Sequence, residues 1–319
     1  MKRLLAVAAA AALVLAGCGY DETRVPKAAA TSAPSSTAPA PAPTCDASTA
    51  LRSYAPASTL PGPGDLPPGS TMAKIRKRGR LIAGVSADTY LLGSRNPLTG
   101  KIEGFDIDVV RQLAAAILGS PDRYQLRVIT AADRLPLLQK DEVDVVVRNM
   151  TINCERWESI AFSAEYYASG QKIMVRRGSD ITGLSTLAGH RVCAPTGTSS
   201  LDNLRRLAPK AIAVEAPNHT SCLLKFQQGD VDAITGDDTV LAGLAAQDPY
   251  AVVLKDKPFT SEPYGIGVNK DHVDLVRFIN GVLEKMRSDG AWENSYRTWL
   301  APTLGKSPGQ PRPEYGRQP

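Results

Sequence analysis

Residues 138–146 read LQKDEVDVV, and residues 226–234 read FQQGDVDAI. Each stretch has the pattern of the end of an amphipathic helix, a polar turn and a short apolar strand. Because the two strands are apolar without alternation, we expect them to be parallel and covered on both faces. The repeat therefore predicts two similar α/β units within one chain.

Similar segments also precede the two copies. A glycine, a basic residue and a β-rich run occur at 79–83 and again at 189–193. Each run is followed by a polar loop and a predicted helix, Phe105–Leu118 in the first copy and Ser199–Leu207 in the second. The repeated order indicates two open α/β lobes, each with a mostly parallel sheet flanked by helices.

Two further strands, at 172–176 and 262–268, are expected to cross between the lobes as an antiparallel hinge. The second lobe is then an insertion in the first, with a cleft between them. The expected organisation is a first lobe at 45–169, a second lobe at 170–263, a return to the first at 264–304 and a flexible tail at 305–319. The tail is expected to fray because it is rich in Pro and Gly.

The chain begins with Lys2 and Arg3, an apolar run at 4–16, and Leu-Ala-Gly before Cys18. As a helix this run covers about 20 Å, too little for a hydrocarbon core of about 30 Å, so residues 1–17 are predicted to be a signal peptide. The run before Cys18 resembles a bacterial lipobox, which implies a lipid-anchored protein on the extracytoplasmic face of the membrane. The alternative is an ordinary signal peptide that happens to contain a cysteine. Residues 18–44 are mostly Ala, Pro, Ser and Thr and predict a disordered spacer.

The four remaining cysteines predict two disulfides in an oxidising compartment and allow three pairings. We favour Cys193–Cys222 within the second lobe and Cys45–Cys154 between the N-terminal extension and the first lobe. No Cys-x-x-Cys occurs and the three histidines are scattered, so neither a metal site nor a cofactor is expected. The net charge of +5 is mild, and the basic run at 74–80 is typical of a solvated helix end, not of a nucleic-acid surface.

In open α/β sheets, ligands bind beyond the carboxyl ends of the strands. Two facing lobes direct both sets of strand ends into one crevice. In the repeat, Asn149 corresponds to Asp237, and both follow equivalent strands. We therefore expect both loops to face the cleft.

Arg156 and Asp237 are the sharpest binding candidates. A guanidinium forms two parallel hydrogen bonds with a carboxylate, and a carboxylate at a strand end accepts from an ammonium group. Together they suit the opposite poles of a zwitterion. The alternatives are a surface Arg156 paired with Glu155 or Glu158, and an Asp237 that caps the next helix.

The loop 195–199, Pro-Thr-Gly-Thr-Ser, lies between a predicted strand and a predicted helix. Gly197 permits a tight turn, and free N–H groups at the helix start can bind a carboxylate. Capping of that helix by Ser199 is the alternative.

The phrases Gly-Phe-Asp-Ile-Asp at 104–108, Met-Thr-Ile-Asn-Cys-Glu-Arg at 150–156 and Phe-Ser-Ala-Glu-Tyr-Tyr at 162–167 occur in this order with Val231-Asp232-Ala233, Asp237 and Tyr264-Gly265-Ile266. From about 75 to 300 the chain resembles the family 3 extracellular solute-binding proteins of polar amino-acid ABC importers, particularly glutamine- and glutamate-binding lipoproteins. The resemblance implies a two-lobed, type II periplasmic-binding-protein-like fold without enzymatic activity.

The resemblance also assigns roles to single residues. Arg156, with Thr151 and backbone near Thr198, is expected to bind the α-carboxylate, and Asp237 the α-amino group. Asn149 stands where the family places a backbone carbonyl near the ligand.

The chain departs from the family pattern at several positions. Arg148 stands where a small residue is common, and Pro195 stands where a basic or polar residue is often used. Arg148, and Arg134 as a second candidate, would favour a side-chain carboxylate if they reach the cleft; the alternative is outward packing. Tyr90 is the only obvious aromatic residue for stacking on a ligand. Glutamate, aspartate, glutamine and asparagine all remain candidate ligands.

The expected function is a monomeric receptor that closes on its amino acid and delivers it to a membrane ABC permease. One alternative is a sensor of the same fold with a membrane signalling partner. Another is an arogenate or prephenate dehydratase, for which Glu155 and Glu165 are the remaining candidate acids. We expect no histidine in the cleft loops.

Overall fold

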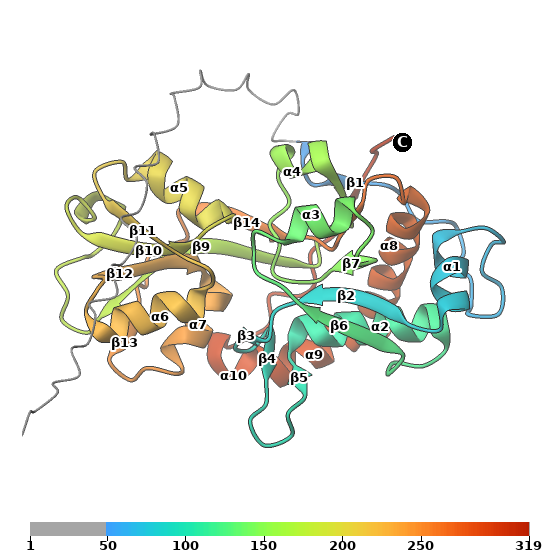
Figure 1. Cartoon of the computed structure of the whole chain (residues 1–319), viewed down its shortest axis with the longest axis horizontal. Helices are drawn as coiled ribbons and strands as arrows, with labels where there is room; N and C mark the ends of the chain where they lie inside the picture. The colour runs from blue at the N-terminus through green and yellow to red at the C-terminus, as the bar shows by residue number, and fades with distance from the viewer. Residues whose placement is uncertain (1–48, 319) are drawn as a thin grey trace, which may run out of the picture. The chain divides into compact units, whose positions relative to one another are not determined.

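The computed structural model describes residues 49–318, which form two main sheets joined by two strands (Figure 1). The first sheet has the order β6-β2-β7-β15-β8. Its strands are β2 (Leu81–Val85), β6 (Tyr124–Val128), β7 (Val145–Val146), β8 (Ile160–Phe162) and β15 (Gly267–Asn269). Strand β2 runs parallel to β6 and β7, whereas β15 is antiparallel to β7 and β8.

The second sheet has the order β11-β10-β12-β9-β13, and β14 also pairs with β9. Its strands are β9 (Tyr167–Arg176), β10 (Arg191–Pro195), β11 (Ile212–Ala216), β12 (Ala233–Asp237), β13 (Ala251–Val253) and β14 (Thr260–Tyr264). Strand β10 is parallel to β11 and β12, and β9 is antiparallel to its neighbours. The two sheets thus share one arrangement, and the predicted two-lobed α/β fold is confirmed. Each sheet is mixed and not mostly parallel, because the returning strands β15 and β9 pair antiparallel with their neighbours.

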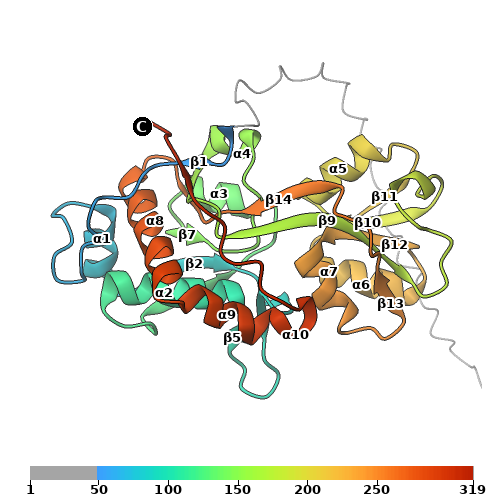
Figure 2. The same cartoon turned by 180° about the vertical axis from the view of Figure 1, so that it is seen from behind.

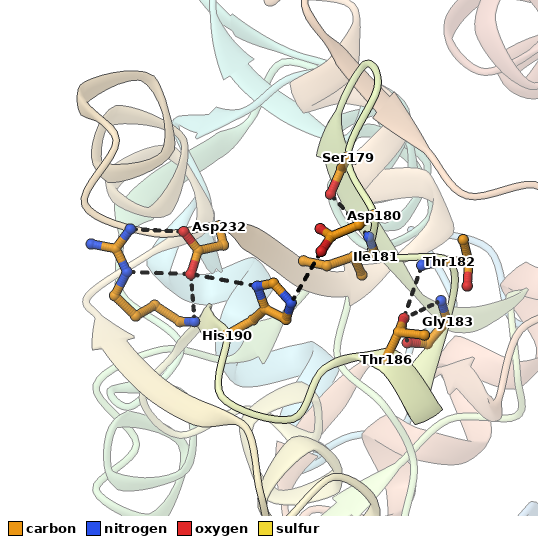
Figure 3. Close-up of polar contacts among 9 residues, drawn as sticks. Ser179, Asp180, Ile181, Thr182, Gly183, Thr186, His190 and Asp232 are labelled. Atoms are coloured by element: carbon orange, nitrogen blue, oxygen red, sulfur yellow. Dashed lines mark hydrogen bonds and ion pairs between the residues drawn. The ribbon is translucent and has the colours of Figure 1, made fainter.

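The Val-Asp repeat joins the same two strands in each sheet. The Asp144 carboxylate accepts a hydrogen bond of 2.7 Å from the backbone N–H of Ile82, at the start of β2. The Asp232 carboxylate accepts one of 2.8 Å from the N–H of Arg191, at the start of β10. Figure 3 shows Asp232 in this position, with His190 on its other side. The repeated aspartate therefore fixes the start of the third strand of each unit beside the first.

Helices cover both faces of the two sheets. They are α1 (Thr71–Arg78), α2 (Phe105–Leu118), α3 (Arg134–Gln139), α4 (Cys154–Ser159), α5 (Ser199–Leu207), α6 (His219–Gln228), α7 (Asp238–Ala245), α8 (Val273–Ser288), α9 (Ala291–Trp299) and α10 (Ala301–Leu304). Val145 and Val146 of β7 point into different apolar cores on opposite sides of the first sheet. In the second sheet Val192 and Cys193 of β10 likewise belong to two different apolar cores, one on each face. Burial on both faces explains why these strands are apolar without alternation.

The hinge consists of β9 and β14, which run side by side between the two sheets in both views (Figures 1 and 2). Their antiparallel register extends from the pair Tyr167–Tyr264 to the pair Gln171–Thr260. Tyr167 and Tyr264 are buried beside Tyr166 and Trp292 in an aromatic cluster at the first lobe. The chain thus leaves the first lobe and returns to it at paired positions.

The predicted Cys193–Cys222 bridge is present and joins β10 to α6. Cys154 is also disulfide-bonded. Its predicted partner Cys45, the lipidation candidate Cys18, the signal peptide 1–17 and the spacer 18–44 lie outside the described residues. Within 49–318 no helix is both long and apolar enough to cross a bilayer.

The expected flexible tail is instead attached to the first lobe. Strand β16 (Glu314–Tyr315) pairs in parallel with β1 (Arg52–Ser53) of the N-terminal extension. The Tyr315 hydroxyl donates to Glu284 of α8 at 2.8 Å, and the Gln310 amide donates to the Leu283 carbonyl at 3.0 Å. The composition suggested fraying, but these anchors on α8 hold an extended Pro-rich segment in place. A small sheet of β3 (Asp88–Thr89), β4 (Gly93–Arg95) and β5 (Ile102–Glu103) completes the first lobe.

Candidate functional site

A small cavity of about 10 Å³ lies between the strand ends of the two sheets. The first lobe lines it with Thr89, Ala131, Arg134, Arg148, Asn149, Thr151 and Arg156. The second lobe lines it with Pro195, Thr198, Ser199, Ser200, Asn218, His219 and Asp237. Seven of the nine residues predicted to bind the ligand are in this lining.

The two other predicted residues have different positions. Gly197 adjoins the cavity: its carbonyl accepts a hydrogen bond of 2.9 Å from Arg134. With φ of +73° and the Ala132 Cα 2.9 Å from where a Cβ would stand, this position requires glycine. Tyr90 is outside the site, which corrects the prediction. Tyr90 is 46% exposed and lines a separate surface groove, because it lies in the turn after β3 with its side chain toward solvent. The preceding residue, Thr89, lines the cavity instead.

Arg156 is buried in the first turn of α4. The helix begins after the N-cap Asn153, whose side chain accepts from the Arg156 N–H at 2.9 Å. The guanidinium donates to the Thr151 carbonyl at 2.6 Å. Within the described part of the chain it forms no ion pair with Glu155, Glu158 or any other carboxylate. The surface alternative therefore fails for this residue.

Arg134 and Arg148 are also buried at the cavity, so neither packs outward. Arg134 donates to the carbonyls of Ala131 at 2.8 Å and of Gly197, on the other lobe, at 2.9 Å. Arg148 donates to the Ile129 carbonyl at 3.0 Å. Burial lowers the pKa of all three guanidinium groups, and Arg156 and Arg148 lower that of Arg134 further. Over residues 49–318 none of the three has a carboxylate partner within ion-pair distance, and the cavity lining holds three guanidinium groups but one carboxylate, Asp237. The Glu262 and Asp106 carboxylates act on Arg156 and Arg148 from outside the lining.

Asp237 ends β12 on the opposite side of the cavity. It holds the N-cap position of α7 without making a capping bond, because the neighbouring Asp238 accepts from the Thr239 N–H at 2.7 Å. Asp237 Oδ2 accepts from the Tyr264 hydroxyl at 2.8 Å, whereas its Oδ1 is buried and has no partner in the described structure. Burial, followed by the nearby Glu262 carboxylate, raises the pKa of Asp237 to about 8.

Asn149, the counterpart of Asp237 in the repeat, has a positive φ of 35°. Its N–H donates to the Asp106 carboxylate at 3.0 Å, while its side-chain oxygen is buried and unpartnered among the described residues. A buried acceptor without a donor costs about 1–3 kcal/mol. Two such acceptors at one cavity are suited to receive N–H donors of a cation.

Glu262 of the hinge strand β14 is a site residue that no sequence pattern indicated. Its buried carboxylate accepts from the Thr151 hydroxyl at 2.7 Å and from the Ser199 hydroxyl at 2.6 Å. It therefore holds together one residue of each lobe at the edge of the cavity. Thr198, and not Ser199, caps α5, since its hydroxyl accepts from the Leu201 N–H at 3.3 Å.

His219 contradicts the expectation that no histidine faces the cleft. Helix α6 begins at His219, with Asn218 as N-cap, and this places the buried imidazole in the cavity lining. Burial lowers its pKa to about 4, so the ring is neutral at pH 7. In residues 49–318 no group of His, Cys, Asp and Glu could hold a metal ion.

Comparisons with known proteins agree with this architecture. Residues 81–302 match the bacterial extracellular solute-binding proteins, family 3. The ABC transporter glutamine-binding protein GlnH of Bacillus subtilis (strain 168) is 39% identical over 231 residues, which are 72% of this chain and 84% of that protein. The glutamate-binding protein GluB of Corynebacterium efficiens is 32% identical over 259 residues, 78% of this chain and 86% of the relative.

Solved structures of two amino-acid-binding proteins have a similar fold. An ancestral arginine-binding protein bound to glutamine has a TM-score of 0.65 at 30% identity, covering 72% of this chain and 99% of its own. The solute receptor for L-cysteine of Neisseria gonorrhoeae has a TM-score of 0.72 at 25% identity, covering 75% of this chain and 98% of its own.

Proposed function

Since the chain belongs to the bacterial extracellular solute-binding proteins of family 3, we propose that it binds one L-amino acid between its lobes and delivers it to a membrane ABC importer. The family consists of binding proteins, and the chain is accordingly not an enzyme. Glu155 and Glu165, the candidate acids of a dehydratase, are not in the cavity lining.

The proposal rests on the opposite charge types on the two sides of the cavity, a guanidinium on one lobe and a carboxyl group on the other. Arg156 on the first lobe and Asp237 on the second line the same small space. Asp237 Oδ1 is buried without a donor, and Arg156 has no carboxylate partner among residues 49–318. Buried charged groups require partners. A zwitterion supplies a carboxylate to one and an ammonium to the other.

We assign the α-carboxylate to Arg156, with Thr151 and the backbone near Thr198, and the ammonium to Asp237 with Asn149. A ligand that touches both lobes stabilises their closed arrangement by its differential affinity for that state.

The three guanidinium groups in the cavity lining favour an acidic side chain on the ligand. Arg134 and Arg148 bring two more buried guanidinium groups, and both donate only to backbone carbonyls in the described structure. We propose that glutamate or aspartate is preferred over glutamine or asparagine. The relatives named for glutamine and glutamate support a ligand of this size class.

The test is a thermal-shift screen of the twenty amino acids, followed by titration calorimetry of those that raise Tm. A ligand well above its Kd should raise Tm by several degrees. Arg156→Ala should abolish this shift and leave the ligand-free Tm nearly unchanged. Arg76→Ala, at an exposed position of α1, is the matched control and should bind like the wild type. Tight binding by Arg156→Ala would refute the assignment.

We also propose that the protein is anchored to the extracytoplasmic face of the membrane through a lipid on Cys18. Cys18→Ser should move the protein from the membrane fraction to the soluble fraction. Mass spectrometry of the wild type should find an N-terminal peptide that begins at a lipid-modified Cys18; an unmodified peptide would contradict the anchor.

A further inference from the structure

We propose that the C-terminal segment, residues 305–318, braces the helix that presents Arg156, and that Arg317 and Trp157 are positioning residues of the ligand site. The proposal rests on the ligand-binding role proposed above for Arg156. It concerns segments on either side of the residues that match the family, 81–302.

Helix α4 cannot determine its own orientation. It spans six residues, Cys154–Ser159, and a helix of this length has little stability without tertiary packing. Arg156 faces the ligand cavity, whereas the next residue, Trp157, packs on the aromatic rings of Tyr54 and Phe162 at centroid distances of 6.2 and 5.5 Å. The packing of Trp157 therefore sets the direction in which α4 presents Arg156.

Three specific contacts of Trp157 come from outside the family-matched region. The Arg317 guanidinium lies over the indole ring, 3.7 Å from its centroid. The indole N–H donates to the Ala50 carbonyl at 2.8 Å, and Tyr54 meets the ring edge-on. Within 81–302 Phe162 is a ring partner of Trp157, which also packs against the apolar core of the first lobe. The chain thus surrounds this side chain with its two terminal segments.

Arg317 is itself held at several points. Its backbone N–H donates to the Ser53 carbonyl at 3.1 Å, and its Nε donates to the Arg52 carbonyl at 2.9 Å. These bonds continue the parallel pairing of β16 with β1. Both views show the C-terminal end near β1 (Figures 1 and 2). These bonds therefore hold the guanidinium in place over the indole ring.

The brace and the disulfide act on different residues of α4. Cys154, its first residue, is disulfide-bonded, and Trp157 is clamped by Arg317. Binding sites require their groups to be held within about 0.5 Å of the productive geometry. Loss of the cation–π contact should thus misplace Arg156 and weaken ligand binding about three- to tenfold.

The experiment compares Arg317→Ala with Arg312→Ala, an exposed arginine of the same segment, and with Arg317→Lys. Calorimetry gives the Kd for L-glutamate and L-glutamine, and hydrogen exchange followed by mass spectrometry gives the protection of the α4 amides in the ligand-free protein. We expect Arg317→Ala to raise Kd about three- to tenfold and to speed exchange in α4. Arg312→Ala should change neither quantity, and Arg317→Lys should restore most of the affinity because it keeps a cation over the ring.

Unchanged α4 exchange in Arg317→Ala would overturn the brace. Faster exchange with a wild-type Kd would also overturn it, because the segment would then be structural only. A wild-type protein that binds none of the twenty amino acids would instead refute the proposed function, and the brace would then be decided by the exchange data alone.

Discussion

Replacing Asp237 with asparagine should allow the two lobes to close without a ligand. The cavity of about 10 Å³ between them is too small to admit an amino acid, so the lobes must separate during each binding cycle. For the separated lobes, in which water reaches Asp237, we take the ordinary carboxyl pKa of 3.8. In the closed arrangement, burial and the nearby Glu262 and Asp238 carboxylates raise the pKa of Asp237 to about 8, against the lowering effects of Tyr264 and Arg134.

This difference sets a pH-dependent penalty on closure. At pH 7 the ligand-free protein must take up a proton on Asp237 to close, which costs about 1.4 kcal/mol for each pH unit above 3.8, or about 4 kcal/mol. The closed state is then disfavoured by about a thousandfold. At pH 5 the penalty falls to about 2 kcal/mol, because the proton is more available. A ligand ammonium removes the penalty by pairing with the charged carboxylate.

Small-angle X-ray scattering of the ligand-free protein measures the effect. We expect the wild type to have a larger radius of gyration at pH 7.5 than at pH 5, and Asp237→Asn to be compact at both. Asp230→Asn, in an exposed turn of the same lobe, should behave like the wild type. A radius of gyration that is the same for wild type and Asp237→Asn at pH 7.5 would refute the reasoning.

Three other predictions follow from the site and the fold. Arg148→Gln should reduce the preference for glutamate over glutamine by about 30-fold or more, as expected when one partner of a buried charge pair is lost, and an unchanged ratio of calorimetric Kd values would count against that role. Replacing both Cys193 and Cys222 with serine should lower the free energy of unfolding in urea by about 3.6 kcal/mol, from the loop-closure entropy of a separation of 29 residues; a loss under about 1 kcal/mol would contradict it. Burial, with the nearby Glu314 carboxylate, raises the pKa of Glu165 to about 7, so the folded state binds more protons than the unfolded state between pH 4.5 and 7 and loses stability as pH rises through this range. Glu165→Gln should therefore have a higher Tm than the wild type at pH 8 but not at pH 4.5, and equal Tm values at pH 8 would exclude this effect.

Much of the fold could be predicted because it is encoded locally and repeated. The Val-Asp pairs mark the third strand of each unit, and their aspartates make the same bond to the first strand. The predicted bounds of α2 and α5 agree with the structure, since each helix has an apolar face. The correspondence of Asn149 with Asp237 also placed two residues of the cavity lining correctly.

What could not be predicted depends on contacts between distant residues or on side-chain direction. Glu262 bonds to Thr151 from 111 positions away, and no local pattern specifies that pairing. Tyr90 points outward from a turn, although its neighbour Thr89 lines the cavity. His219 was missed because the sequence reading did not use Asn218 as an N-cap, a signal that places His219 at the first position of α6, beside the strand ends. The tail was judged by composition, but its attachment depends on α8 and β1.

The chain leaves the first sheet and returns to it at Tyr167 and Tyr264, which are paired across the hinge. Because the two ends of the second lobe are adjacent, this lobe can be replaced by that of a related protein without a change in the path of the remaining chain. The exchanged second lobe would bring its own Asp237 side of the ligand site. The first lobe would keep the arginine side. Chimaeras between such receptors are thus a direct route to new combinations of solute preference, and natural recombination has the same junctions at its disposal.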